Sequence, residues 1–178
     1  YGVNKDFSKA AKWFKLAAEQ GLSWTQYKLA GFYYEGKGVT QDYTEAANWY
    51  RKAAEQGHRE AQAKLGVCYY YGRGVAENNE EAVKWFTESN NGESQYYLAK
   101  CYRNGYGVAV DYTVALDWML KSINNGYTDA AYDLADDYLN GNYGLPANDE
   151  KYIEYLRIAA DMGHMTAQFT LGQAYYHA

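Results

Sequence analysis

The chain has 178 residues, of which 48% are apolar, 18% are aromatic and 22% are charged, and its net charge is −5. A negative chain without clustered Lys and Arg argues against a nucleic-acid partner. No apolar stretch approaches the roughly 18 residues that span a membrane. The chain also lacks the pattern of a signal peptide, which is a basic start followed by an apolar run. We therefore expect no nucleic-acid partner and no membrane span.

One sequence pattern recurs along the whole chain. Its leucines are spaced by 36, 33, 36 and 37 residues: Leu29, Leu65, Leu98, Leu134 and Leu171. A second column of large aromatic residues runs in parallel: Trp13, Trp49, Trp85, Trp118 and Tyr155. Such a period indicates an array of stacked units, because one unit cannot bury its apolar face alone. In chain order the pattern predicts a half repeat over 1–21, four repeats over 22–57, 58–92, 93–126 and 127–163, and a half repeat over 164–178.

Each full repeat is expected to form two helices. In the first helix of 58–92, Ala61, Leu65 and Tyr69 fall at helical spacing. The first helix of each repeat should end at a glycine that can adopt a positive φ: Gly36, Gly72, Gly105 and Gly141. The second helix should begin after an N-cap residue: Asp42, Asn78, Asp111 and Asn148. Glu45 and Glu81 lie three residues further on and resemble capping boxes. The result is an all-α chain of about ten helices, with the tryptophan column in its core.

The pattern also resembles a known family. In the repeat over 22–57 it consists of Gln26, Leu29, Tyr33, Gly36, Gly38, Val39, Asp42, Ala46, Trp49, Tyr50, Ala53, Ala54 and Gly57. These residues at this spacing are similar to the Sel-one-like repeat, a relative of the tetratricopeptide repeat. The resemblance covers essentially the whole chain. It implies a right-handed α/α superhelix, a solenoid of antiparallel helix pairs, whose first helices line a concave face, and an adaptor or scaffold role. Compartment stays unassigned, and a bacterial source is favoured.

The variable positions of the first helices form the candidate binding surface. Positions −5, −2, −1, +2 and +5 relative to each leucine share one helix face. The residues predicted to bind a protein or peptide there are Trp24, Tyr27, Lys28, Tyr34, Lys64, Tyr70, Tyr96, Tyr97, Lys100, Arg103, Tyr132, Asp133, Asp136, Phe169 and Tyr176. Tyrosine offers a large contact area at low entropic cost, which suits an interface. The alternative interpretation is that these tyrosines pack between neighbouring repeats.

Charge is uneven along the chain. Residues 129–178 contain eight Asp and Glu against two Lys and Arg. Asp129, Asp133, Asp136 and Asp137 lie on one predicted helix, and the first three are expected near one face. Such a face could steer a basic partner, or it could simply be solvated.

Catalytic motifs are not found. The three histidines follow no zinc spacing, no serine is followed by a lysine three residues later, and the glycine loops match no phosphate-binding motif. Cys68 and Cys101 occupy equivalent places in adjacent repeats, too far apart for a disulfide, so we expect free thiols. We therefore expect no enzyme activity, no metal and no cofactor. A hydrolase or small-molecule binder is the least favoured alternative. The other alternative is a structural spacer in a longer repeat protein that contacts partners through its convex face or its ends, with end-to-end self-association.

Overall fold

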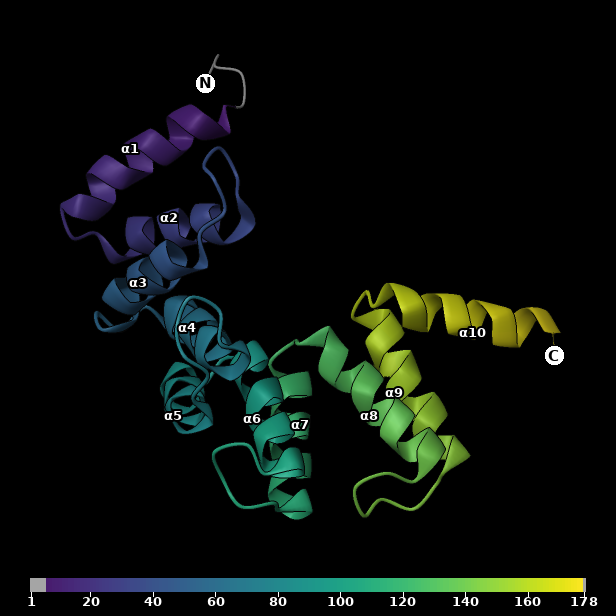
Figure 1. Ribbon diagram of the computed structural model, residues 1–178. Helices are drawn as coiled ribbons and strands as arrows, with labels where there is room; N and C mark the ends of the chain where they lie inside the picture. The colour runs from purple at the N-terminus through teal and green to yellow at the C-terminus, as the bar shows by residue number, and fades with distance from the viewer. Residues whose placement is uncertain (1–5, 178) are drawn as a thin grey trace. The chain divides into compact units, whose positions relative to one another are not determined.

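The computed structural model describes residues 6–177, which form ten helices (Figure 1). In chain order they are α1 (Phe7–Glu19), α2 (Ser23–Glu35), α3 (Tyr43–Ala54), α4 (Arg59–Tyr71), α5 (Asn79–Ser89), α6 (Gly92–Asn104), α7 (Tyr112–Asn124), α8 (Thr128–Asn140), α9 (Asp149–Asp161) and α10 (Met165–His177). No β-strand occurs within residues 6–177. The prediction of an all-α chain with about ten helices is confirmed.

The helices form two compact units. The first unit ends at Asn91 and the second begins at Gly92. In the first unit α2 pairs with α3 and α4 pairs with α5, while α1 packs on α2 and α3 packs on α4. In the second unit α6 pairs with α7 and α8 pairs with α9, while α7 packs on α8 and α9 packs on α10. The first helices of the successive pairs are therefore α2, α4, α6 and α8, and α10 continues this series.

The predicted N-caps begin the second helices. The Asp42 carboxylate accepts hydrogen bonds from the backbone N–H groups of Thr44 and Glu45, at 2.9 and 3.0 Å. The equivalent residues cap the other second helices: Asn78 for α5, Asp111 for α7 and Asn148 for α9. A capping box also requires the N-cap N–H to donate to the glutamate side chain, and this part of the prediction is wrong. The Asp42 N–H donates instead to the Tyr33 carbonyl, at 2.9 Å. The N-cap thus also ties the start of α3 to the end of α2.

The glycine loops hold the end of one helix pair against the previous one. The predicted C-cap glycines have positive φ, as required: Gly36, Gly72, Gly105 and Gly141. In the following loop of the first unit, Gly74 has a φ of 74°. A Cβ there would lie 1.9 Å from the carbonyl oxygen of Tyr43, so only glycine lets the loop approach the start of α3. At Gly144, in the longer α8–α9 loop of the second unit, a Cβ would meet only the ring of Tyr112 at 3.6 Å.

The core follows the leucine column. Leu29, Leu65, Leu98 and Leu134 are almost completely buried, and alanines surround them. The tryptophan column is buried to different degrees. Trp49 is buried, and Trp85, Trp118 and Tyr155 are partly buried against the core. In contrast, 67% of Trp13 is exposed, because α1 packs mainly on α2 and no described helix covers its other side. The prediction of a core tryptophan is therefore wrong at position 13.

Candidate functional site

The residues of the predicted binding surface differ widely in exposure. Four are exposed: Trp24, Asp136, Phe169 and Tyr176. Ten are partly buried: Tyr27, Lys28, Tyr34, Lys64, Tyr70, Tyr97, Lys100, Arg103, Tyr132 and Asp133. Tyr96 is buried, with 8% of its surface exposed. The surface is therefore not a uniform row of accessible tyrosines.

Two of the tyrosines pack against the start of the next first helix. Tyr27 stacks on His58 with ring centroids 4.8 Å apart, and Tyr132 stacks on His164 with centroids 4.3 Å apart. Both histidines cap a helix: Nδ1 of His58 accepts from the N–H of Ala61 at 3.3 Å, and His164 caps α10 in the same way. Sequence reasoning missed this role. These tyrosines contribute to packing between repeats, as the alternative interpretation proposed.

Tyr34 and Tyr70 also have aromatic or cationic neighbours within the first unit. The Arg73 guanidinium donates to the Tyr34 hydroxyl and lies 4.9 Å from the ring centroid of Tyr71. Tyr70 packs edge-to-face on Tyr71 with centroids 4.8 Å apart. The contact between Arg73 and Tyr34 holds the α4–α5 loop against the end of α2.

In the second unit, a hydrogen-bonded network joins α6 to α8. The Tyr96 hydroxyl donates to the Asp133 carboxylate at 2.6 Å, and the Lys100 ammonium donates to the Tyr96 oxygen at 3.3 Å. Burial, followed by the hydrogen bond to Asp133, raises the pKa of Tyr96 well above its usual value. Tyr96, Lys100 and Asp133 are therefore engaged with one another across the two helices.

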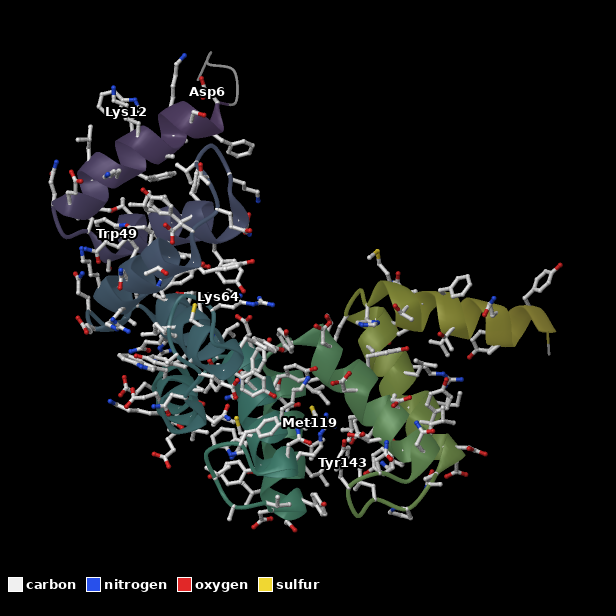
Figure 2. The ribbon with its side chains drawn as sticks, in the orientation of Figure 1. Asp6, Lys12, Trp49, Lys64, Met119 and Tyr143 are labelled. Carbon is white, nitrogen blue, oxygen red and sulfur yellow. The ribbon has the colours of Figure 1, made fainter. Side chains whose placement is uncertain are left out.

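A buried ion pair continues this network. Arg103 on α6 and Asp137 on α8 are 2.8 Å apart, with side chains only 12% and 9% exposed. The Arg103 guanidinium lies 4.3 Å from the ring centroid of Tyr143, which comes from the α8–α9 loop (Figure 2). Burial raises the pKa of Asp137, and Arg103 offsets part of that increase. Asp137 is thus a buried partner of Arg103 and not part of an acidic surface.

In the first unit, the corresponding region between α2 and α4 is hollow. A space of about 250 Å³ is lined by Phe7, Tyr27, Lys28, Gly31, Phe32, Glu35, Lys37, Tyr50 and Lys64. We call this space the α2/α4 hollow; Figure 2 labels Lys64, which contributes to it from α4. Lys28 also lies against the exposed Trp24, with 5.4 Å between its ammonium and the ring centroid. Lys37 and Glu35 form an ion pair.

The hollow results from a few differences at equivalent positions. Relative to the leucine of each helix, Tyr27 matches Tyr96, but Gly31 stands where α6 has Lys100. On α4, Lys64 stands where α8 has Asp133. Gly31 therefore leaves α2 without a side chain at the position equivalent to Lys100. The Tyr50 hydroxyl lies 3.8 Å from where a Gly31 Cβ would be. Neither Gly31 nor Tyr50 was among the residues predicted to bind a partner. The glycine at a position that is a lysine in α6 could have indicated the hollow.

The cysteines and other potential ligands show no reactive arrangement among residues 6–177. Cys68 and Cys101 are buried free thiols. Burial raises their pKa values to about 11 and about 12, so both remain protonated at neutral pH. No group of three or more His, Cys, Asp and Glu side chains in this part of the chain could hold a metal ion. None of the described helices is long and apolar enough to cross a membrane.

Comparison with known proteins assigns the family. The family model described as Sel1 repeat matches residues 1–22, 25–58, 59–90, 92–127 and 128–164. The chain belongs to the Sel1 repeat family. Proteins of this family generally mediate protein–protein interactions. No curated protein matches this Sel1 repeat chain.

Solved structures agree with this assignment. A Sel1 repeat protein from Oxalobacter formigenes is 35% identical, with a TM-score of 0.80 over 89% of this chain and 64% of that one. The antigen c5321 of uropathogenic Escherichia coli, which displays the same fold, is 33% identical, with a TM-score of 0.61 over 99% of this chain and 46% of that one. Immunity protein Pa5087 from Pseudomonas aeruginosa, at 18% identity and a TM-score of 0.52, covers 90% of this chain and 76% of that one and shows the fold alone. The Sel1 repeat chain spans less than two thirds of the length of the first two.

Proposed function

We propose that this Sel1 repeat chain is a non-catalytic module that binds a segment of another protein through the α2/α4 face of its first unit. This face is defined as the α2/α4 hollow together with the adjoining Trp24. The observation that carries the proposal is the hollow itself, which combines aromatic walls with lysines from two helices. Protein interfaces commonly place an aromatic anchor beside such a depression.

Differences in exposure between the units support the choice of this face. Trp24 is 53% exposed and lies beside Lys28 at the hollow. On the equivalent face of the second unit, Tyr96 and Asp133 bond to each other, and Arg103 pairs with Asp137. A partner could engage that second face only after breaking these contacts.

A matched pair of double variants tests the proposal. Trp24→Ala/Lys28→Ala removes an aromatic residue and a cation from the α2/α4 face, and Lys12→Ala/Trp13→Ala removes the same two types from α1. In extracts of the source cells, the first variant should lose the protein that the unaltered chain captures, and the second should retain it. A loss of about 2 kcal/mol, or roughly thirtyfold in affinity, is expected for an aromatic anchor. Helical circular dichroism of both variants controls for folding.

The second candidate function is a structural spacer that contacts partners through its ends or convex face. It is favoured by one observation, the exposed apolar side chains of α1 and α10. They are Phe7, Trp13, Leu16, Met165, Phe169, Tyr175 and Tyr176. The same pair of variants separates the two functions, because the spacer would lose its partner with Lys12→Ala/Trp13→Ala and keep it with Trp24→Ala/Lys28→Ala.

A further inference from the structure

We propose that two copies of this chain associate head to tail, with α1 of one copy packing on α10 of the other. The contact rebuilds the helix pair of a complete repeat, because α1 corresponds to a second helix and α10 to a first helix. This inference goes beyond the proposed function and does not rest on it, since it concerns α1 and α10 and not the α2/α4 face. It comes from the sequences of the two helices, from what they expose, and from charge.

α1 has the sequence of a second helix. Residues 7–21 read FSKAAKWFKLAAEQG, and residues 43–57, which begin with α3, read YTEAANWYRKAAEQG. Trp13 therefore corresponds to Trp49, yet Trp13 is 67% exposed and Trp49 only 7%. α3 packs on α2, the first helix of its own pair, and on α4, the first helix of the next pair. α1 packs on α2 in the second of these ways, and among residues 6–177 no helix packs on it in the first.

α10 has the sequence of a first helix. Residues 164–176 read HMTAQFTLGQAYY, and residues 58–70, which include most of α4, read HREAQAKLGVCYY. In α4 a Cβ built on Gly66 would lie 2.5 Å from the ring of Phe86, so the second helix of that pair packs its aromatic ring on the glycine. At the equivalent Gly172 of α10, a Cβ would meet no described atom within 4 Å. α10 thus presents the glycine that a second helix packs on.

α1 carries the aromatic residue that fits this glycine. Phe14 occupies the position in α1 that Phe86 occupies in α5. In its own copy Phe14 packs edge-to-face on Trp24 and Phe32 of α2, with ring centroids 5.7 and 5.5 Å apart. It nevertheless stays partly exposed, whereas Phe86 is completely buried. Packing of α1 on α10 of a second copy places the exposed part of Phe14 against Gly172.

Apolar surface on α10 lies where the contact requires it. Leu171 keeps part of its surface exposed, whereas Leu65 at the equivalent position of α4 is completely buried. Phe169 is 65% exposed, and the equivalent Ala63 of α4 is completely buried. Removal of such carbon surface from water favours helix association. A second helix placed on α10 buries the same positions that α5 buries on α4.

Charge favours a second copy as the occupant. On α1, Lys9 pairs with Asp6, which leaves Lys12 and Lys15 against Glu19. Residues 129–178, which include α10, contain eight Asp and Glu against two Lys and Arg. A positive helix and an acidic end attract each other, whereas two α1 helices or two acidic ends repel. The charges therefore favour the head-to-tail contact over either symmetric one.

Sedimentation velocity of the chain of residues 1–178 tests the proposal. The weight-average sedimentation coefficient should rise between about 5 and 500 µM, because a contact between two helices is smaller than a standard interface and correspondingly weak. Trp13→Asp on α1 and Phe169→Asp on α10 should each keep the chain monomeric over this range. Val110→Asp in the α6–α7 loop adds the same charge at a residue that is 52% exposed, and it should leave association unchanged.

A mixture of the two single variants shows the direction of the contact. Trp13→Asp retains α10, and Phe169→Asp retains α1, so an equimolar mixture should form dimers and no larger species. Gly172→Leu tests the shape of the contact. Its side chain has room in a single copy, but it occupies the place of Phe14 of the second copy and should weaken association at least about tenfold.

Three results would overturn the proposal. They are a monomer at every concentration of the unaltered chain, self-association of a folded Trp13→Asp or Phe169→Asp chain by itself, and a mixture of these two folded variants that forms no dimer. Circular dichroism and thermal unfolding show whether each variant is folded. If either Asp variant does not fold, Gly172→Leu decides the question, and unchanged association of that variant would overturn the proposal. Capture of a partner by the α2/α4 face is a separate measurement that none of these results affects.

Discussion

The α2/α4 face of the first unit and the α6/α8 face of the second share one register but differ in what fills the space between the helices. Between α6 and α8, Tyr96, Lys100 and Asp133 form a connected set of hydrogen bonds. Between α2 and α4, Gly31 and Lys64 occupy two of the equivalent places, and a hollow remains. The comparison shows that a repeat scaffold can turn a packed helix contact into a candidate binding site by changing very few side chains.

The largest effect is expected at the loops, where Gly74 of the first unit approaches a neighbouring backbone far more closely than Gly144 of the second approaches its neighbour. Gly74→Ala should destabilise the chain by about 4 kcal/mol, because its Cβ would overlap the backbone of Tyr43. Gly144→Ala has a similar positive φ but only an ordinary contact with Tyr112, so it should cost about 1–2 kcal/mol. Urea unfolding of both variants measures the difference. Equal losses would mean that backbone strain alone, and not close approach, requires the glycine.

A somewhat smaller effect is expected at the buried ion pair of the second unit. Arg103→Met should destabilise the chain by about 3 kcal/mol, because it leaves the buried Asp137 charge uncompensated. Lys121→Met, which breaks an exposed pair with Asp117 at 2.6 Å, should cost at most about 0.5 kcal/mol.

The pH dependence of the Arg103→Met variant has a definite sign. Burial raises the pKa of Asp137, and removal of Arg103 raises it further. A carboxyl group with a raised folded-state pKa favours the folded state at low pH, and that contribution is lost as the pH rises through the folded-state pKa. The difference in unfolding free energy between wild type and variant should therefore shrink as the pH falls toward 3.8, the ordinary value for Asp. A constant difference would show that Asp137 is not the group left unpaired.

A smaller effect than at Gly74 or Arg103 is expected when the α6/α8 face receives the lysine that the α2/α4 face has at the equivalent position. Asp133→Lys removes the acceptor of the Tyr96 hydroxyl and should destabilise the second unit by about 2 kcal/mol. Thermal unfolding measures the loss. An unchanged midpoint would contradict a stabilising role for the Tyr96–Asp133 hydrogen bond.

The sequence predicted the features that depend on local pattern. The buried leucines, the N-cap at Asp42 and the positive φ at Gly36 all follow from residue type and spacing. The accessibility of the tyrosines could not be predicted, since Tyr27 is held by His58, which belongs to the next repeat. Exposure of Trp13 likewise depends on which helices surround α1. The hollow depends on a missing side chain at Gly31, and a search for chemically active residues does not select a glycine.

The most direct test of the α2/α4 face compares capture of the partner protein by Trp24→Ala/Lys28→Ala with capture by Lys12→Ala/Trp13→Ala. If the α2/α4 face binds the partner, the first variant loses the captured protein and the second retains it. Retention by the first variant, with or without loss by the second, would contradict the claim that this face of the first unit is the binding face.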